Sequence, residues 1–140
     1  MEYRKFNNVL VIRMERGEEI MEKLKEVALK ESVRLANVNA LGAVDEFTVG
    51  AYDVLEKKYN SNTFKGVYEI VSLTGSINTM NGEYYSHIHM AAADEKGQTV
   101  GGHLNSARIS ATCEMFIYIV DGEVDRFKDE STGLNLFKFN

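Results

Sequence analysis

Tyr85-Ser86-His87-Ile88-His89-Met90, followed shortly by Gly101-Gly102-His103-Leu104, contains all three histidines of the 140-residue chain. If the first segment is a β-strand, alternate side chains point to one face, so His87 and His89 lie side by side, roughly 6.5–7 Å apart along the backbone. The glycine pair permits a close approach of the backbone, so we expect His103 to reach the same face. Three imidazoles with an open fourth position suit zinc or a similar divalent metal.

Two interpretations of the histidine pair stay open at this point. A His-x-His pair on a strand is also compatible with a hydrogen-bonded surface pair, and no Cys-x-x-Cys or His-Glu-x-x-His motif accompanies it. A catalytic metal would need a general base nearby, which the sequence does not identify. Three carboxylates are candidates for that base: Glu83, Asp94 and Glu114. Asn105 and Ser106, which follow His103, are candidates for orienting the ligands.

Length and composition predict one ordinary globular domain spanning residues 1–140. The hydrophobic share is 44% and the charged share 26%, which is typical of such proteins. No apolar run reaches membrane-spanning length and the N-terminus lacks a signal-peptide core, so we expect a cytoplasmic protein that does not associate with membranes. The single cysteine, Cys113, excludes an internal disulfide and is expected to be a buried, inert thiol.

The charge balance argues against direct DNA binding. The formal net charge is −5, whereas affinity for nucleic acid comes largely from Lys and Arg that neutralise phosphates. The basic residues are scattered, and the densest runs are only Arg4-Lys5 and Lys57-Lys58.

Periodicity predicts an α/β chain of the α+β kind, a mixed and mostly antiparallel sheet with one main helix packed on it. The helix is expected to open at Glu18-Glu19 and to keep its apolar period as far as Leu35. Asn81-Gly82 predicts a hairpin turn into the histidine strand, and Asp121-Gly122 a further hairpin. The segment 59–64 is expected to be a polar turn or loop. Strands are predicted at 9–14, 35–41, 46–52, 68–80 (as one strand or as two that meet at Gly75), 84–93, 111–120 and 134–139.

The apolar run Ala111–Val120 predicts a central strand that is buried on both faces. A single helix gives too little cover for such a sheet, so we expect another subunit to cover part of it. On this same strand Glu114 is a candidate partner of Arg108 in a structural ion pair.

Several motifs together resemble the PPC domain (plants and prokaryotes conserved domain). They are the histidine segments above, Gly17-Glu18-Glu19-Ile20, Ala40-Leu41-Gly42-Ala43-Val44 and the stretch Gly66-Val67-Tyr68-Glu69-Ile70-Val71-Ser72-Leu73-Thr74-Gly75. The last is similar to the family's Gly-Arg-Phe-Glu-Ile-Leu-Ser-Leu-x-Gly. The resemblance spans about residues 8–139.

The resemblance implies a homotrimer and a metal site at His87, His89 and His103. It also implies a partner-binding stretch at Gly66, Val67, Tyr68, Glu69, Ile70 and Val71. Val67 stands where the family has arginine, so the five-donor guanidinium is missing here. Prokaryotic members are commonly labelled DNA-binding by analogy with plant relatives, whose AT-hook holds the DNA; this chain has no proline with which to form an AT-hook.

Three functions follow as hypotheses. The first is a homotrimeric regulatory or protein-interaction module with a three-histidine metal site. The second is a zinc-dependent hydrolase or lyase that acts on a small substrate. The third is direct binding of DNA, which the acidic charge argues against.

Overall fold

Eight strands and one helix are present in residues 1–139, the part of the chain that the computed structural model describes. In chain order they are β1 (Glu2–Phe6), β2 (Val9–Glu15), α1 (Ile20–Lys30), β3 (Ala36–Asp53), β4 (Lys58–Met80), β5 (Glu83–Ala93), β6 (Thr99–Ile119), β7 (Asp125–Lys128) and β8 (Asn135–Lys138). Every strand pairing in this part is antiparallel, which confirms the predicted α+β class.

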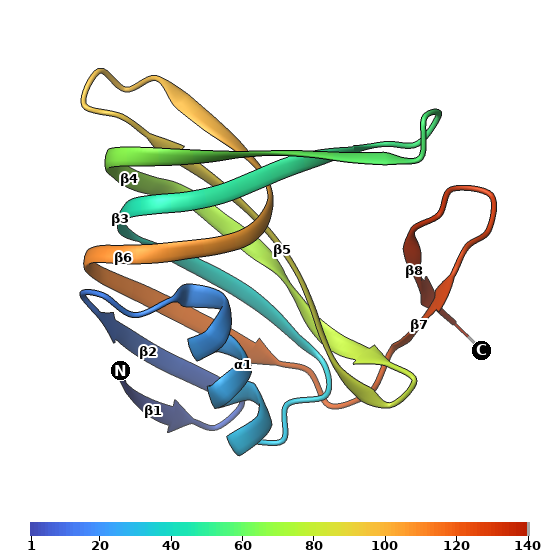
Figure 1. Cartoon of the computed structure of the whole chain (residues 1–140). Helices are drawn as coiled ribbons and strands as arrows, with labels where there is room; N and C mark the ends of the chain where they lie inside the picture. Colours follow the sequence, from blue (N-terminus) through green and yellow to red (C-terminus); the bar gives the residue numbers. More distant parts are fainter. Residues whose placement is uncertain (140) are drawn as a thin grey trace.

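The main sheet has the order β1-β2-β6-β3-β4-β5 and is closed on itself because β5 also pairs with β6 (Figure 1). The length of β6 makes this closure possible. Its first residues, Thr99–His103, pair with β5, and the rest of the strand pairs with β3 and β2. The short β7–β8 hairpin forms a separate two-stranded sheet that stands beside the main one.

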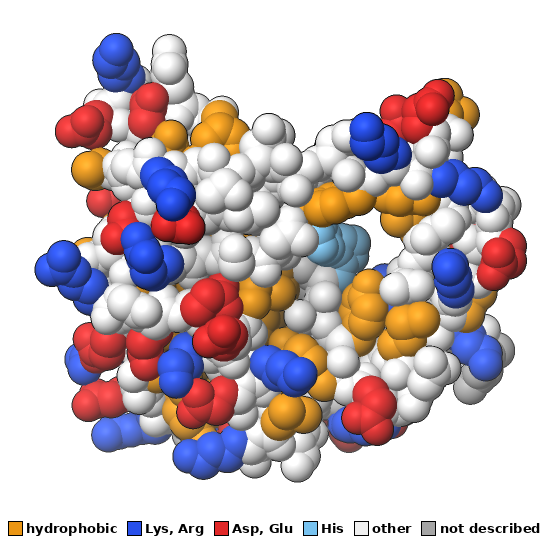
Figure 2. All heavy atoms as spheres, viewed as in Figure 1, with side chains coloured by type: hydrophobic (Ala, Val, Ile, Leu, Met, Phe, Trp, Pro, Cys, Tyr) orange, Lys and Arg blue, Asp and Glu red, His pale blue; other side chains and the backbone are white. Residues whose placement is uncertain are grey.

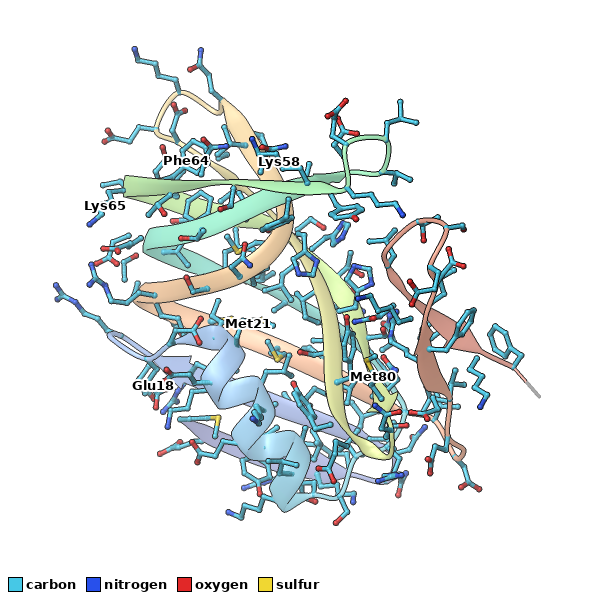
Figure 3. The ribbon with its side chains drawn as sticks, turned by 45° about the vertical axis from the view of Figure 1, so that its right-hand side comes forward. Glu18, Met21, Lys58, Phe64, Lys65 and Met80 are labelled. Atoms are coloured by element: carbon cyan, nitrogen blue, oxygen red, sulfur yellow. The ribbon has the colours of Figure 1, made fainter. Side chains whose placement is uncertain are left out.

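The core lies inside this curved sheet, where alternate residues of each strand point inward. Phe47 is fully buried and its ring stacks on that of Phe64, with the centroids 5.4 Å apart. Phe64 lies on β4 (Figure 3). The helix α1 covers the core with its apolar side, which comprises Ile20, Leu24, Val27 and Ala28. The thiol of Cys113 is buried as predicted, and burial raises its pKa to about 12.

The helix is shorter than the sequence predicted. Glu19 is its N-cap, with a side-chain oxygen accepting a hydrogen bond from the Glu22 amide at 2.7 Å. It ends at Lys30, because Ser32 takes a φ of 54° and the Val33 amide turns back to the Ala28 carbonyl. The predicted extension to Leu35 is therefore wrong.

Two predicted strands merge into β3, and the predicted loop at 59–64 is part of β4. Tyr59 pairs with Tyr52 and Phe64 pairs with Phe47, so the polar residues between them continue the hairpin. Pairing with β3 supplies the backbone hydrogen bonds that the local sequence did not predict. The segment 68–80 is one strand that runs through Gly75, and Asn81-Gly82 forms the predicted turn with φ values of 54° and 78°.

Two predictions near the C-terminus are corrected. The run Ala111–Val120 is buried on one face only, because Phe116 and Tyr118 are 40% and 44% exposed. The predicted hairpin at Asp121-Gly122 does not form, since β7 pairs with β8 and not with β6. No helix within residues 1–139 is long and apolar enough to cross a membrane.

Candidate metal centre

The three histidines meet on the outer face of the sheet where β5 pairs with β6. His87 and His89 share a face of β5 because strand side chains alternate. His103 of β6 lies directly opposite His89 in the β5–β6 ladder. Strand alternation and cross-strand register thus bring together residues that are separated along the chain, and the predicted convergence of the three side chains is present.

The nitrogen spacing fits a small divalent ion. The Nε2 atoms of His87 and His89 are 3.1 Å apart, and one nitrogen from each of the three rings lies within 4.8 Å of the others. A tetrahedral ion with nitrogen ligands at about 2.0–2.1 Å needs neighbouring nitrogens roughly 3.3 Å apart. The donor set of three imidazoles suits zinc.

Glycines allow the strands to approach closely at this point. A Cβ atom at Gly101 would lie 2.5 Å from the Met90 carbonyl oxygen, and one at Gly102 would lie 2.5 Å from the Gly50 oxygen. At Gly75, a Cβ would lie 2.0 Å from the carbonyl oxygen of His87. Side chains at these positions would push apart the strands that carry the histidines.

The cluster borders a hollow between the main sheet and the β7–β8 hairpin. Figure 2 shows the histidine side chains at the wall of this hollow, with hydrophobic side chains around its opening. Tyr59, from the end of the β3–β4 hairpin, stands edge-on to His103 with the centroids 6.0 Å apart. Its hydroxyl donates a hydrogen bond to the Oδ1 atom of Asn105. Lys57 bonds the Glu130 carbonyl oxygen at 3.0 Å and joins the two hairpins across the hollow.

The environment favours the neutral form of His87 and His103. Burial, and after it the neighbouring charges of His103, His89 and Arg126, together lower the pKa of His87 to about 4. Burial also lowers the pKa of His103, and the nearby charge of His89 is a second, smaller cause of the same shift. Neutral imidazole is the form that coordinates a metal, so these rings remain available as ligands below the usual titration range of histidine.

The metal-free protein is expected to lose stability as the pH falls from about 6.5 to about 4. In this window the unfolded chain protonates His87 while the folded chain does not, so acid favours unfolding. Urea denaturation of chelator-treated protein at the two ends of this window measures the effect. The variant His87→Gln serves as the control, and an equally steep loss in that variant would rule out His87 as the cause.

The three candidate general bases lie away from the histidines. Asp94 accepts hydrogen bonds from the Lys96 and Gln98 amides in the turn after β5. Glu83 pairs with Met80 at the β4–β5 hairpin, and Glu114 lies opposite Arg13. No aspartate or glutamate in the described part of the chain joins the histidine cluster.

The predicted pairing of Arg108 with Glu114 is wrong. Arg108 instead bonds Asp45 at 2.7 Å and lies 3.6 Å from Glu46, both on the adjacent strand β3. A bulge in β3 next to these residues brings the carboxylates beside the guanidinium. Spacing along the sequence does not reveal the strand register that results from this bulge.

The stretch Gly66–Val71 lies on β4, apart from the histidines. Glu69 pairs with Ala93, which is four residues along β5 from His89, or roughly 13 Å. Tyr68 and Ile70 turn inward, with the Tyr68 ring edge-on to Phe47 at 5.1 Å. Val67 and Val71 are 67% and 57% exposed. The stretch therefore offers an apolar outer surface that does not touch the metal centre.

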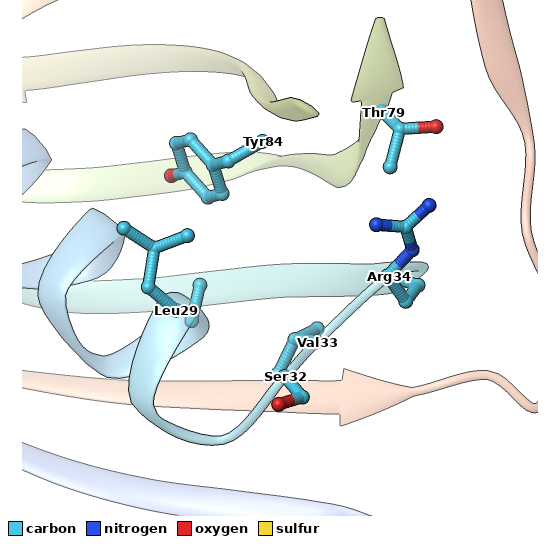
Figure 4. A pocket seen from close by; sticks show the side chains of 7 residues that line it. Leu29, Ser32, Val33, Arg34, Thr79 and Tyr84 are labelled. Atoms are coloured by element: carbon cyan, nitrogen blue, oxygen red, sulfur yellow. The ribbon is translucent and has the colours of Figure 1, made fainter. Parts of the chain in front are cut away.

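A separate cavity of about 200 Å³ lies between α1 and the β4–β5 hairpin (Figure 4). Tyr84 and Arg34 are among its lining residues, and the Tyr84 hydroxyl is the buried side-chain group without a hydrogen-bond partner in residues 1–139. Burial raises the pKa of this hydroxyl. The cavity is lined by none of the histidines.

Sequence reasoning did not identify Tyr59 and Arg126 as neighbours of the histidine cluster. Tyr59 falls in the segment predicted as a loop, and Arg126 belongs to a strand whose pairing was predicted wrongly. Arg126 stands between Asp125 and Phe127 in a short strand, and alternation alone does not say which face its side chain joins.

Comparison with known proteins identifies relatives over nearly the whole chain. The model of the Plants and Prokaryotes Conserved (PCC) domain, the family abbreviated PPC above, matches residues 1–121. Among curated proteins, none matches this sequence.

The solved structures that are similar to this chain include the following three. A Bacteroides thetaiotaomicron protein, named as a candidate DNA-binding protein, is 27% identical with a TM-score of 0.96, covering 99% of this chain and 96% of its own. A metal-containing protein of Archaeoglobus fulgidus is 30% identical with a TM-score of 0.88 and the same coverage of 99% and 96%. A PPC protein of Pyrococcus horikoshii is 25% identical with a TM-score of 0.85, covering 99% and 94%.

Proposed function

Because this chain belongs to the Plants and Prokaryotes Conserved (PCC) domain family, we propose that it is a homotrimeric binding and regulatory module whose His87, His89 and His103 hold zinc or a similar divalent metal. The observation that carries this proposal is the convergence of three imidazole nitrogens within 4.8 Å of one another. The metal-containing Archaeoglobus relative supports it. A three-imidazole site leaves one coordination position for a ligand that enters from the hollow.

Elemental mass spectrometry of untagged, purified protein tests the metal site, with the mass in solution measured on the same sample. The proposal expects near one metal ion per chain. A metal-free protein that also fails to rebind added zinc would contradict it.

An enzyme is the second candidate, and the open coordination position beside a hollow is the observation that favours it. Zinc in such a site lowers the pKa of bound water to about 7 and so supplies hydroxide at neutral pH. The reaction would be hydrolysis or a lyase step on a small substrate. Bound metal without turnover of such substrates would favour the binding module.

DNA association has weaker support in this chain. The Bacteroides relative is named as a candidate DNA-binding protein. Against this, the net charge is −5, and acidic and basic side chains are interspersed on the face shown in Figure 2. Binding through phosphates would weaken steeply with added salt, which distinguishes it from recognition of a protein or a small ligand.

The exposed apolar face of the sheet supports assembly into an oligomer. Phe116 and Tyr118 of β6 stack with their centroids 6.1 Å apart, and Leu41 of β3 is 58% exposed on the same side. Val67 and Val71 of β4 extend the apolar surface. Contiguous patches of this kind mark contact sites between proteins, and we assign this one to the trimer, with Gly66–Val71 as the part that also contacts other proteins.

The variant Phe116→Glu is expected to convert the trimer to smaller species. A charge in the centre of an apolar interface stays unpaired and desolvated, which opposes association. Light scattering coupled to gel filtration measures the mass. Leu55→Glu is the matched control, because Leu55 is 94% exposed in the turn between β3 and β4. An unchanged trimer in Phe116→Glu would place the interface elsewhere.

A further inference from the structure

Arg126 is a buried arginine beside the metal centre. It is the second residue of β7, its side chain is among the buried ones at 7% exposure, and its guanidinium lies between two aromatic rings. The guanidinium carbon is 4.8 Å from the Tyr85 ring centroid and 4.3 Å from that of Phe137. The two rings hold the planar group in one orientation.

The protein gives this cation only neutral partners. Nε donates to the Asn78 Oδ1 atom at 3.1 Å and Nη1 donates to the Asn135 carbonyl oxygen at 2.6 Å. Among residues 1–139 these are its hydrogen bonds, so Nη2 has no partner there and, unlike the Tyr84 hydroxyl, it is not fully buried. The adjacent carboxylate of Asp125 accepts from the Thr79 hydroxyl instead. A buried charge without a counter-ion is unfavourable, so the site calls for an anion from outside.

The position of Tyr85 places Arg126 next to the histidines. Tyr85 and His87 are two residues apart on one face of β5, roughly 6.5–7 Å along the strand. The guanidinium stacked on Tyr85 therefore lies on the part of β5 that carries the histidines. A divalent metal on three neutral imidazoles would add further positive charge to this face, and the described residues place no carboxylate in the cluster to balance it.

We propose that Arg126 anchors an anion in the hollow, and that the ligand of this site is a small carboxylate. Its carboxylate pairs with Nη2 of Arg126, and a second oxygen a few bonds away occupies the open position on the metal. This assignment rests on the proposed metal site. A carboxylate is favoured over phosphate because the free donor group here is a single guanidinium nitrogen, Nη2. Phosphate sites usually combine several hydrogen-bond donors.

Isothermal titration of the zinc-loaded wild-type protein tests the assignment with malonate, its neutral analogue malonamide and inorganic phosphate as probes. We expect malonate to bind at least about tenfold more tightly than malonamide, because a hydrogen bond to a charged partner is lost. Arg126→Gln and Arg126→Lys should each weaken the binding of malonate about tenfold or more. The lysine variant keeps the charge but lacks the planar guanidinium fork. Arg13→Gln is the matched control, since Arg13 is an exposed arginine on β2 that pairs with Glu2 and Glu15.

Zinc affinity, measured on the same variants by chelator competition, separates this inference from the proposed function. If wild-type protein binds no zinc, the metal site fails, and malonate titration of the metal-free protein still tests Arg126. If zinc binds but malonate affinity is unchanged in both Arg126 variants, the anchor is overturned. Phosphate binding more tightly than malonate in an Arg126-dependent way would overturn the carboxylate assignment. If Arg126→Gln does not fold, equal binding of malonate and malonamide by the wild type would be the result that overturns it.

Discussion

Replacing His103 with alanine is expected to lower zinc affinity by about 100-fold or more, because loss of a ligand exceeds the roughly 10–100-fold effect of removing an outer-shell partner. His103 faces His89 across the β5–β6 ladder, and the remaining His87 and His89 would hold the ion with two nitrogens only. The fold should persist, since the backbone pairing of residue 103 does not depend on its side chain. Competition with a chromogenic chelator measures the affinity, and circular dichroism follows the fold.

Tyr59→Phe is the control for His103→Ala. It removes the hydroxyl that bonds Asn105 but keeps the ring beside His103, so zinc affinity should change by less than about tenfold. Unchanged affinity in His103→Ala would mean that the ion binds elsewhere. Collapse of the fold, or of the proposed trimer, in that variant would make the histidine structural.

Replacing Gly75 with alanine is expected to destabilise the protein by about 3 kcal/mol, at the upper end of what an added methyl group costs in a packed site. The new Cβ would lie 2.0 Å from the His87 carbonyl oxygen and 2.8 Å from the Ile88 Cα, both backbone atoms that cannot rotate away. The β4–β5 ladder must open at the residues between His87 and His89. Urea denaturation measures the loss, and zinc affinity should fall with it because the histidine pair is displaced.

Gly97→Ala is the matched control for Gly75→Ala. Gly97 lies in the turn after β5 with φ of 76° and has no atom within 4 Å of its added Cβ. Its substitution should cost only about 1 kcal/mol of backbone strain. Equal losses of stability in the two variants would show that the ladder relaxes around the methyl group introduced at position 75.

The strand that carries His87 and His89 was predictable because its cues are local. Asn81-Gly82 favours a tight hairpin, and apolar Ile88 and Met90 alternate with the histidines. The segment 59–64 has no such cue. Its polar residues form a strand because they pair with β3, where their partners include Ala51, Gly50 and Val49. The conformation of the segment therefore depends on these partners and not on its own residues.

The candidate site was predictable in its ligands and not in its surroundings. The chain contains three histidines in total, so composition alone restricted the choice of metal ligands to these residues. Arg126 and Tyr59 reach the same hollow from β7 and from the tip of the β3–β4 hairpin, and each depends on how a hairpin is placed against the sheet. Long-range placement of this kind leaves no periodic pattern in the sequence.

The sequence by itself determined the donor set, the histidine strand, its turn and the α+β class. Periodicity, turn residues and side-chain chemistry all act over a few neighbouring residues. Only the tertiary structure decided that β5 closes onto β6 with His89 opposite His103, that Arg126 lies buried between Tyr85 and Phe137, and that Arg108 pairs with Asp45. Those contacts join residues far apart in the chain, and they follow from strand register and packing, which the whole core sets together.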